Sequence, residues 1–109
     1  MKEIPFNEFL EKYQAGEIQV VDVREQAEYD AVHLDGVLLL PLSELLDRYT
    51  ELDKDQAYYV ICKSGGRSGR ACQFLEEAGY DVTNVQGGMD ALNKRGHLPC
   101  LVIGESNGH

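Results

Sequence analysis

Residues 58–78, YYVICKSGGRSGRACQFLEEA, contain a strand signal, a glycine turn and a helix signal in direct succession. The run Tyr58–Ile61 is short and rich in aromatic and β-branched residues, which predicts a buried strand that ends at Cys62. A turn around Gly65 and Gly66 follows. Apolar residues then recur at helical spacing and lead to a glycine typical of a helix C-terminus, namely Ala71, Cys72, Leu75, Ala78 and Gly79. Free backbone N–H groups and the helix dipole make the start of such a helix an anion site, and here a cysteine lies beside it.

The charges in this stretch also indicate an anion site. No Asp or Glu occurs between Gln56 and Leu75, whereas Lys63, Arg67 and Arg70 do, in a chain of net charge −9. Cations in the first turn of a helix oppose the helix dipole at a cost of roughly 0.3–1 kcal/mol each. The local cluster of positive charge therefore favours capture of an anion over helix stability.

Length and composition restrict the class of protein. A chain of 109 residues predicts one domain over residues 1–109, and 43% hydrophobic with 27% charged residues is typical of a globular protein. The acidic balance argues against nucleic acid or a membrane as partner. No segment approaches membrane-spanning length, and the N-terminus has no apolar signal core, so we expect a cytoplasmic protein.

The chain has three cysteines, Cys62, Cys72 and Cys100, without the spacing of a zinc site, so neither a metal nor another cofactor is expected. Only Cys62 lies in an electropositive turn, which lowers the pKa of a thiol and favours the reactive thiolate. We expect Cys72 to pack in the core and Cys100 to be incidental.

The rest of the chain alternates between two periodicities. Helical spacing covers residues 6–14, 24–31, 42–49 (with Ser43 as N-cap) and 89–95. Strands are expected over 18–23, 37–40 and 81–85, and a frayed tail from about residue 104. This alternation predicts an α/β domain with a mainly parallel sheet of about five strands and helices on both faces. Such sheets bind ligands at the carboxyl ends of their strands, where Cys62 lies.

Three patches of sequence resemble the rhodanese-like sulfurtransferase family, in order and over nearly the whole chain. They are Val21–Arg24 with Glu28-Tyr29 and His33–Pro41, the loop Cys62–Ser68, and Val85–Gly88. The loop is similar to the family's C-x-x-G-x-R-S/T active-site motif and is the most specific patch. Val32, Asp35, Met89 and Leu92 depart from the glycine, proline and tryptophans usual in the family. These departures affect packing and the details of the pocket more than the fold.

The resemblance implies the single-domain rhodanese fold and covalent sulfur transfer. The Cys62 thiolate would take the outer sulfur of thiosulfate or of a persulfide donor, hold it as a persulfide, and pass it to a thiol, to a protein acceptor, or to cyanide. The loop residues Lys63, Ser64, Gly65, Gly66, Arg67 and Ser68 are then expected to bind substrate, and inward backbone N–H groups would stabilise the thiolate.

Supporting functions are expected outside the loop. Arg67 either faces substrate or ties the loop to the scaffold, which is how the family's loop arginine is read. The supporting residues are expected to be Asp22, Arg24, Glu28, His33, Gly87 and Gly88, with an Arg24–Glu28 ion pair and a close approach of the paired glycines to the active loop.

Three other functions remain as alternatives. A cysteine phosphatase or arsenate reductase uses a C-x5-R loop, whereas Cys62 to Arg67 is C-x4-R, a smaller ring of N–H groups suited to one sulfur atom. A non-catalytic rhodanese-like binding module often lacks the cysteine. A persulfide carrier in a protein sulfur relay would use the same residues, with feeble turnover of thiosulfate.

Overall fold

A computed structural model describes residues 1–93 and 101–104 of the chain. Its main sheet has five strands in the order β1-β6-β5-β2-β4, and every pairing in this sheet is parallel. A second, antiparallel sheet joins β3 to β7. The strands are β1 (Lys2–Ile4), β2 (Gln19–Asp22), β3 (Val32–Leu34), β4 (Leu38–Leu39), β5 (Ala57–Ile61), β6 (Asp81–Val85) and β7 (Leu101–Ile103).

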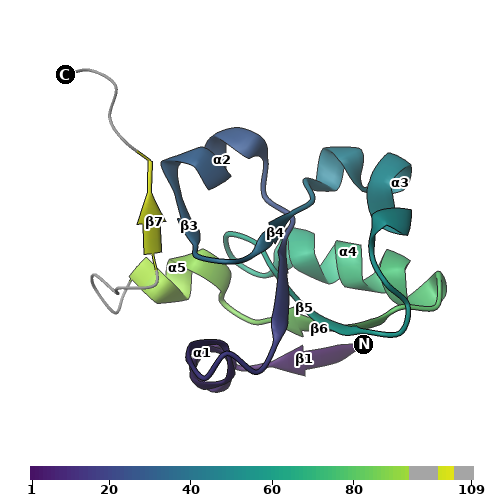
Figure 1. Ribbon diagram of the computed structural model, residues 1–109, viewed down its shortest axis with the longest axis horizontal. Helices are drawn as coiled ribbons and strands as arrows, with labels where there is room; N and C mark the ends of the chain where they lie inside the picture. The colour runs from purple at the N-terminus through teal and green to yellow at the C-terminus, as the bar shows by residue number, and fades with distance from the viewer. Residues whose placement is uncertain (94–100, 105–109) are drawn as a thin grey trace.

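Helices cover both faces of the main sheet (Figure 1). One core contains Val60 with Ala71 and Leu75, and it packs the sheet against α3 and α4. The other contains Ile61 with Phe9 and Leu92, and it packs the opposite face against α1 and α5. The helices are α1 (Phe6–Gln14), α2 (Gln26–Ala31), α3 (Leu45–Arg48), α4 (Gly66–Glu77) and α5 (Gly88–Asn93). Val60 and Ile61 are neighbours in β5, and their side chains belong to opposite cores. The strand is therefore buried on both sides, as the apolar run Tyr58–Ile61 predicts.

The predicted fold class is therefore confirmed: a mainly parallel five-stranded sheet lies between helices. The bounds of α1 and β6 agree with the sequence patterns. The described part of the chain contains no helix that combines the length and apolarity needed to cross a membrane.

The expected helix over residues 42–49 is wrong in detail. It is a short α3 between two 3₁₀ turns, η1 (Leu42–Glu44) and η2 (Tyr49–Glu51). Ser43 is inside the first turn and does not cap a helix. Its hydroxyl instead donates to Glu25 Oε1 at 2.6 Å, so this serine joins the turn to the residue that caps α2.

The chain termini also hold strands that the sequence patterns do not predict. β1 pairs with β6 along one edge of the sheet, and β7 pairs with β3 just before the expected frayed tail. Each has three residues, too few for a periodic signal. The expectations for Cys100, for the end of the last helix near Arg95 and for residues 105–109 concern positions outside the described residues.

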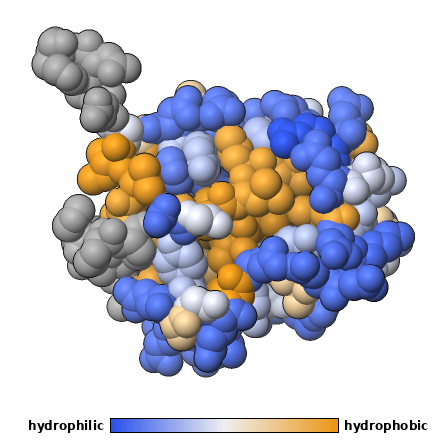
Figure 2. Space-filling model, in the orientation of Figure 1, coloured by the Kyte–Doolittle hydropathy of each residue, from blue (hydrophilic) through white to orange (hydrophobic). Residues whose placement is uncertain are grey.

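The β4 edge of the sheet is less covered than its centre. Figure 2 shows an apolar area on this face, surrounded by hydrophilic residues. Leu38 of β4 and Leu46 of α3 are exposed, whereas Val60 in the central strand is fully buried. The sheet therefore presents apolar surface to solvent near its last strand.

Candidate active site

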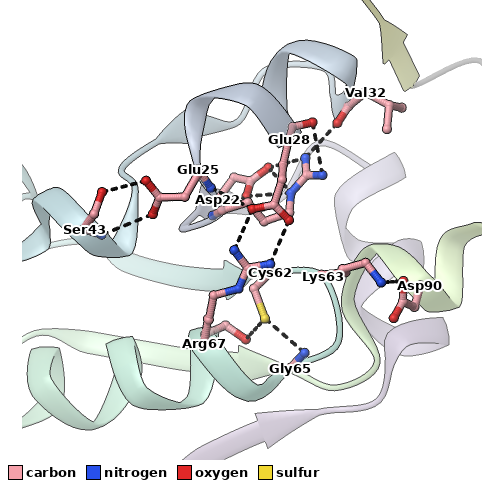
Figure 3. A network of polar contacts seen from close by, with 12 residues as sticks. Asp22, Glu25, Glu28, Val32, Ser43, Cys62, Lys63, Gly65, Arg67 and Asp90 are labelled. Atoms are coloured by element: carbon pink, nitrogen blue, oxygen red, sulfur yellow. Dashed lines mark hydrogen bonds and ion pairs between the residues drawn. The ribbon is translucent and has the colours of Figure 1, made fainter.

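Cys62 directly follows β5, at the carboxyl end of a central strand, and its side chain is only 1% exposed. The Gly65 backbone N–H donates to Sγ at 3.0 Å (Figure 3). The Ser68 hydroxyl lies 3.2 Å from the same sulfur. Both groups come from the loop and from the first turn of α4. The sulfur is thus buried but surrounded by hydrogen-bond donors.

These donors decide the ionisation of the thiol. Burial raises the pKa of Cys62, because a thiolate loses solvation away from water. The Ser68 hydroxyl and the backbone N–H groups of Ser68, Gly65 and Ser64 act in the opposite direction and outweigh burial, so the pKa is lowered overall. Cys72 has no such donors, and burial raises its pKa to about 12. Of these two thiols, only Cys62 has the properties of a nucleophile.

One residue of the loop, Gly65, has a backbone conformation in the left-handed region. Gly65 has φ +104° and directly precedes α4, where its carbonyl accepts the first-turn bond from Gly69 N at 3.1 Å. A side chain at this φ would be strained, which accounts for glycine. The turn points the Gly65 N–H inward while it starts the helix.

The start of α5 holds the loop from the other side. The backbone N–H groups of Met89 and Asp90 donate to the carbonyls of Cys62 and Lys63, at 2.9 and 2.8 Å. Gly88 has φ +53°, and a Cβ there would overlap the Cys62 carbonyl oxygen and lie 2.7 Å from that of Lys63. Two backbone segments that are far apart in sequence are therefore in direct contact, with no room between them for a side chain.

Arg67 pairs with a carboxylate outside the active loop. Its guanidinium makes a bidentate pair with the Glu28 carboxylate of α2, at 2.6 and 2.8 Å (Figure 3). This hydrogen bonding lowers the pKa of Glu28 from its ordinary 4.5 to about 2. Of the two orientations expected for Arg67, the structure has the one that ties the active loop to the scaffold.

The expected Arg24–Glu28 ion pair is wrong. Arg24 pairs instead with the buried Asp22 carboxylate, through Nε at 3.0 Å and Nη2 at 2.8 Å. It reaches Glu28 only at the backbone carbonyl, and it also donates to Val32 O. The two arginines therefore bind different groups of Glu28: Arg24 its backbone carbonyl and Arg67 its carboxylate.

The remaining loop residues lie at the rim. Lys63, Ser64 and Gly66 are exposed, and the Lys63 ammonium lies 3.3 Å from the Asp90 carboxylate. The cation nearest the thiol in sequence thus has an acidic neighbour. Substrate binding by residues 63–68 stays a prediction, which the proposal below takes up.

His33 belongs to the scaffold around α2. Its ring stacks on Tyr29, with centroids 3.6 Å apart and planes 7° apart, and its Nδ1 lies 2.7 Å from the Tyr29 carbonyl oxygen. These contacts hold the imidazole of this β3 residue against Tyr29 of α2. The supporting function expected of His33 agrees with this position.

Two residues that sequence reasoning missed support the loop: Asn84 of β6 contacts it, and Glu3 of β1 contacts Asn84. Asn84 is 3% exposed, and its amide bonds Ser68 Oγ, the Gly65 carbonyl and the Glu3 carboxylate. Asparagine is depleted in strands. An Asn inside the expected strand 81–85 was therefore the signal that could have found it. Glu3 carries no comparable signal.

The described residues contain no group of three or more His, Cys, Asp or Glu side chains placed to hold a metal ion.

The fold and this loop define a class: a parallel α/β domain with a hydrogen-bonded cysteine at the end of a central strand. The family model described as "Rhodanese-like domain" matches residues 6–95. The chain belongs to the rhodanese-like sulfurtransferase family.

Individual relatives agree with this assignment. The chain is 36% identical to "Putative sulfurtransferase YtwF" of Bacillus subtilis (strain 168), covering 84% of this chain and 89% of that protein. It is 38% identical to "Putative sulfur carrier protein YrkF" of the same organism, covering 80% of this chain and 48% of that protein. The crystal structure of a rhodanese-like domain protein from Staphylococcus aureus superposes with a TM-score of 0.84 at 31% identity, covering 96% of this chain and all of that one (100%).

The Glu28→Gln variant tests the ion pair to the active loop. Glutamine can still accept the Glu25 N–H of the capping box, so the substitution removes mainly the charge. Because the folded pKa lies below the unfolded one, the stabilisation is complete above pH 4.5 and is lost as the pH falls through about 2. We expect the variant to be about 1–2 kcal/mol less stable by urea unfolding at pH 7, after allowance for solvent screening, with a smaller difference near pH 3. A difference that does not vary with pH would contradict this assignment.

The Gly88→Ala variant tests the contact between the start of α5 and the loop. The added Cβ meets two carbonyl oxygens in a left-handed conformation, so we expect a loss of about 1–3 kcal/mol or more in the free energy of unfolding. Gly66→Ala is the matched control. A Cβ at Gly66 has no heavy atom within 4 Å, so this variant should unfold at the same urea concentration or a slightly higher one. Equal losses in the two variants would show that the contact does not matter.

Proposed function

We propose that this protein transfers a sulfane sulfur from thiosulfate or a persulfide donor to a thiol acceptor, through a persulfide on Cys62. The observation that carries the proposal is the environment of the Cys62 sulfur. It is buried, its pKa is lowered, and backbone N–H groups and one hydroxyl face it. A thiolate held ionised in this way is a nucleophile that needs no neighbouring base.

The chemistry takes place in two displacements. In the first, the thiolate attacks the outer sulfur of thiosulfate; an S–S bond to Cys62 forms, the bond to the sulfonate sulfur breaks, and sulfite leaves with the electron pair. In the second, an acceptor thiolate attacks the terminal sulfur of the persulfide, and the Cys62 thiolate leaves. Charge is conserved in both steps, and the N–H groups around Cys62 would also stabilise the terminal sulfur of the persulfide.

The position of Arg67 favours sulfur transfer over phosphate chemistry. An enzyme that stabilises a tetrahedral oxyanion needs its cations and donors directed at the reacting group. Here the Arg67 guanidinium is occupied by both oxygens of Glu28 and faces α2. The cradle is left with backbone donors and the Ser68 hydroxyl around one sulfur atom, which suits a persulfide.

A persulfide carrier in a protein relay is the second candidate. It is favoured by the similarity to a relative named a sulfur carrier protein, of which this chain spans about half. The carrier would use the same Cys62 persulfide but would receive the sulfur from a protein and release it to another. Turnover with thiosulfate distinguishes the two functions, because a carrier would load sulfur slowly or not at all from this small donor.

Loading of Cys62 can be measured by intact mass. After incubation with thiosulfate, we expect a gain of one sulfur mass that is lost when cyanide is added. Cys62→Ser should abolish the gain, and the matched control Cys72→Ser should retain it, since the Cys72 thiol is buried and un-ionised. A gain that survives in Cys62→Ser, or hydrolysis of a small aryl phosphate in place of sulfite release, would contradict the proposal.

Lys63 and Asp90 form a matched pair for testing how the rim attracts thiosulfate. Lys63→Ala should raise the KM for thiosulfate about 1.5- to 5-fold, and Asp90→Asn should lower it by a similar factor by removing the competing carboxylate. Both effects should shrink at high salt, because exposed charges are screened. If the KM of both variants were independent of salt, Lys63 would have no part in attracting the donor.

A further inference from the structure

A chain of polar side chains lies behind the Cys62 sulfur, on the side of β6 and β1. The Ser68 hydroxyl is 3.2 Å from Cys62 Sγ and 2.5 Å from Asn84 Oδ1. The Asn84 amide group in turn donates to Glu3 Oε2 at 2.9 Å and to the Gly65 carbonyl at 3.3 Å. Ser68 is fully buried and Asn84 is 3% exposed, so neither can exchange these partners for solvent.

The surroundings of Asn84 fix which end of its amide faces Ser68. A carboxylate and a carbonyl oxygen accept hydrogen bonds but cannot donate them. The Asn84 nitrogen must therefore face Glu3 and Gly65, and the amide oxygen must face the Ser68 hydroxyl. Glu3 is directly opposite Asn84 in the parallel pairing of β1 with β6, so the backbone register holds the carboxylate in place.

Ser68 thus has two acceptors and one proton to donate. A hydroxyl carries a single O–H. When Cys62 is a thiol, its S–H can donate to Ser68 Oγ while the Ser68 proton remains on the Asn84 side. When Cys62 is a thiolate, the sulfur becomes a strong acceptor, and Ser68 can donate to it only by leaving the Asn84 oxygen without that proton.

We propose that Asn84 is a positioning residue that competes with the Cys62 sulfur for the Ser68 proton and so limits how strongly Ser68 stabilises the thiolate. The proposal rests on the proposed function only in taking Cys62 as the nucleophile. Asn84 acts through Ser68 and does not contact the reacting atoms.

This competition balances the two displacements. A more stable thiolate is a better leaving group when the acceptor takes the sulfur, but it is a weaker nucleophile towards the donor. A hydroxyl that donated to the sulfur without competition would favour the second step at the expense of the first. Because Asn84 accepts the Ser68 hydroxyl proton, the Cys62 thiolate is less stabilised and stays reactive when it attacks the sulfur donor.

Other groups around the sulfur must stay constant in a test. The charged or titratable groups near it are Arg67 of α4 with its Glu28 partner, Lys63 with Asp90, Glu3 of β1, and Cys72. None of these residues is substituted in the variants below. Asn84→Leu does remove the amide that donates to Glu3, and an effect through Glu3 would also appear in the Ser68→Ala background. Cys72 has a pKa of about 12, so it stays un-ionised through the range in which Cys62 titrates.

The test is a titration of the Cys62 thiolate by ultraviolet absorbance. The same titration of Cys62→Ser is subtracted, which removes the absorbance changes of the other cysteines and of the tyrosines. Asn84→Leu, which keeps the size of the side chain and removes the acceptor, should lower the pKa of Cys62 by about 0.4–1 unit. Ser68→Ala should raise it by a similar amount. In the Ser68→Ala background, Asn84→Leu should have no further effect on the pKa of Cys62, because the hydroxyl proton for which Asn84 and Cys62 compete is absent.

The proposal would be overturned if the pKa of Cys62 rose or stayed the same in Asn84→Leu. It would also be overturned if Asn84→Leu shifted that pKa equally in the Ser68→Ala background, because this would indicate a general packing effect. Should Asn84→Leu fail to fold, the wild-type protein gives a second measurement. The side-chain amide resonances of Asn84 should titrate with the pKa of Cys62, and this coupling should disappear in Ser68→Ala; if it persisted there, the proposal would fail. Sulfur loading by intact mass is a separate readout, so loss of the proposed function and loss of this competition are distinguishable.

Discussion

Hydrogen bonds to one buried sulfur are the constraint on which the rest of the structure depends. Removal of Cys62 from water disfavours its charged form, and only donors fixed at close range can reverse that effect. Backbone N–H groups serve this purpose well, because they need no rearrangement once the loop is folded. The loop must therefore be rigid, and much of the domain supports it.

Supports act on the loop from both faces of the sheet. The start of α5 binds the loop carbonyls, and the Arg67–Glu28 pair joins α4 to α2 above it. The Asp22–Arg24 pair then anchors α2 to the end of β2. In the described part of the chain, every buried side-chain nitrogen or oxygen has a hydrogen-bond partner. The polar groups around the thiol therefore form a connected set in which few side chains can turn freely.

The sequence could predict the elements whose pattern is local. The helix Phe6–Gln14 and the strand–turn–helix around Cys62 combine periodicity with turn residues, and both agree with the structure. The partners of the arginines could not be predicted in the same way. Spacing along the chain allowed Arg24 to reach Glu28, but Arg67, which is distant in sequence, is closer to that carboxylate in space.

Short elements, and contacts between strands that are distant in sequence, also could not be predicted from the sequence. The strands at the two ends of the chain gain their conformation from pairing, since three residues carry too little periodicity to show it. The function of Asn84 was hidden for a related reason. Its partners come from the loop, from α4 and from β1, and only the sheet order brings these segments together.

The N-terminal strand has a practical consequence for how this domain is delimited. Sequence similarity to the family begins at residue 6, whereas β1 occupies residues 2–4 and forms one edge of the sheet. A protein shortened to the boundary of that similarity would leave the backbone N–H and C=O groups of β6 as a bare edge, open to pairing with a strand from another molecule. Self-association of such a fragment would then reflect the missing strand and would say nothing about the assembly of the intact chain.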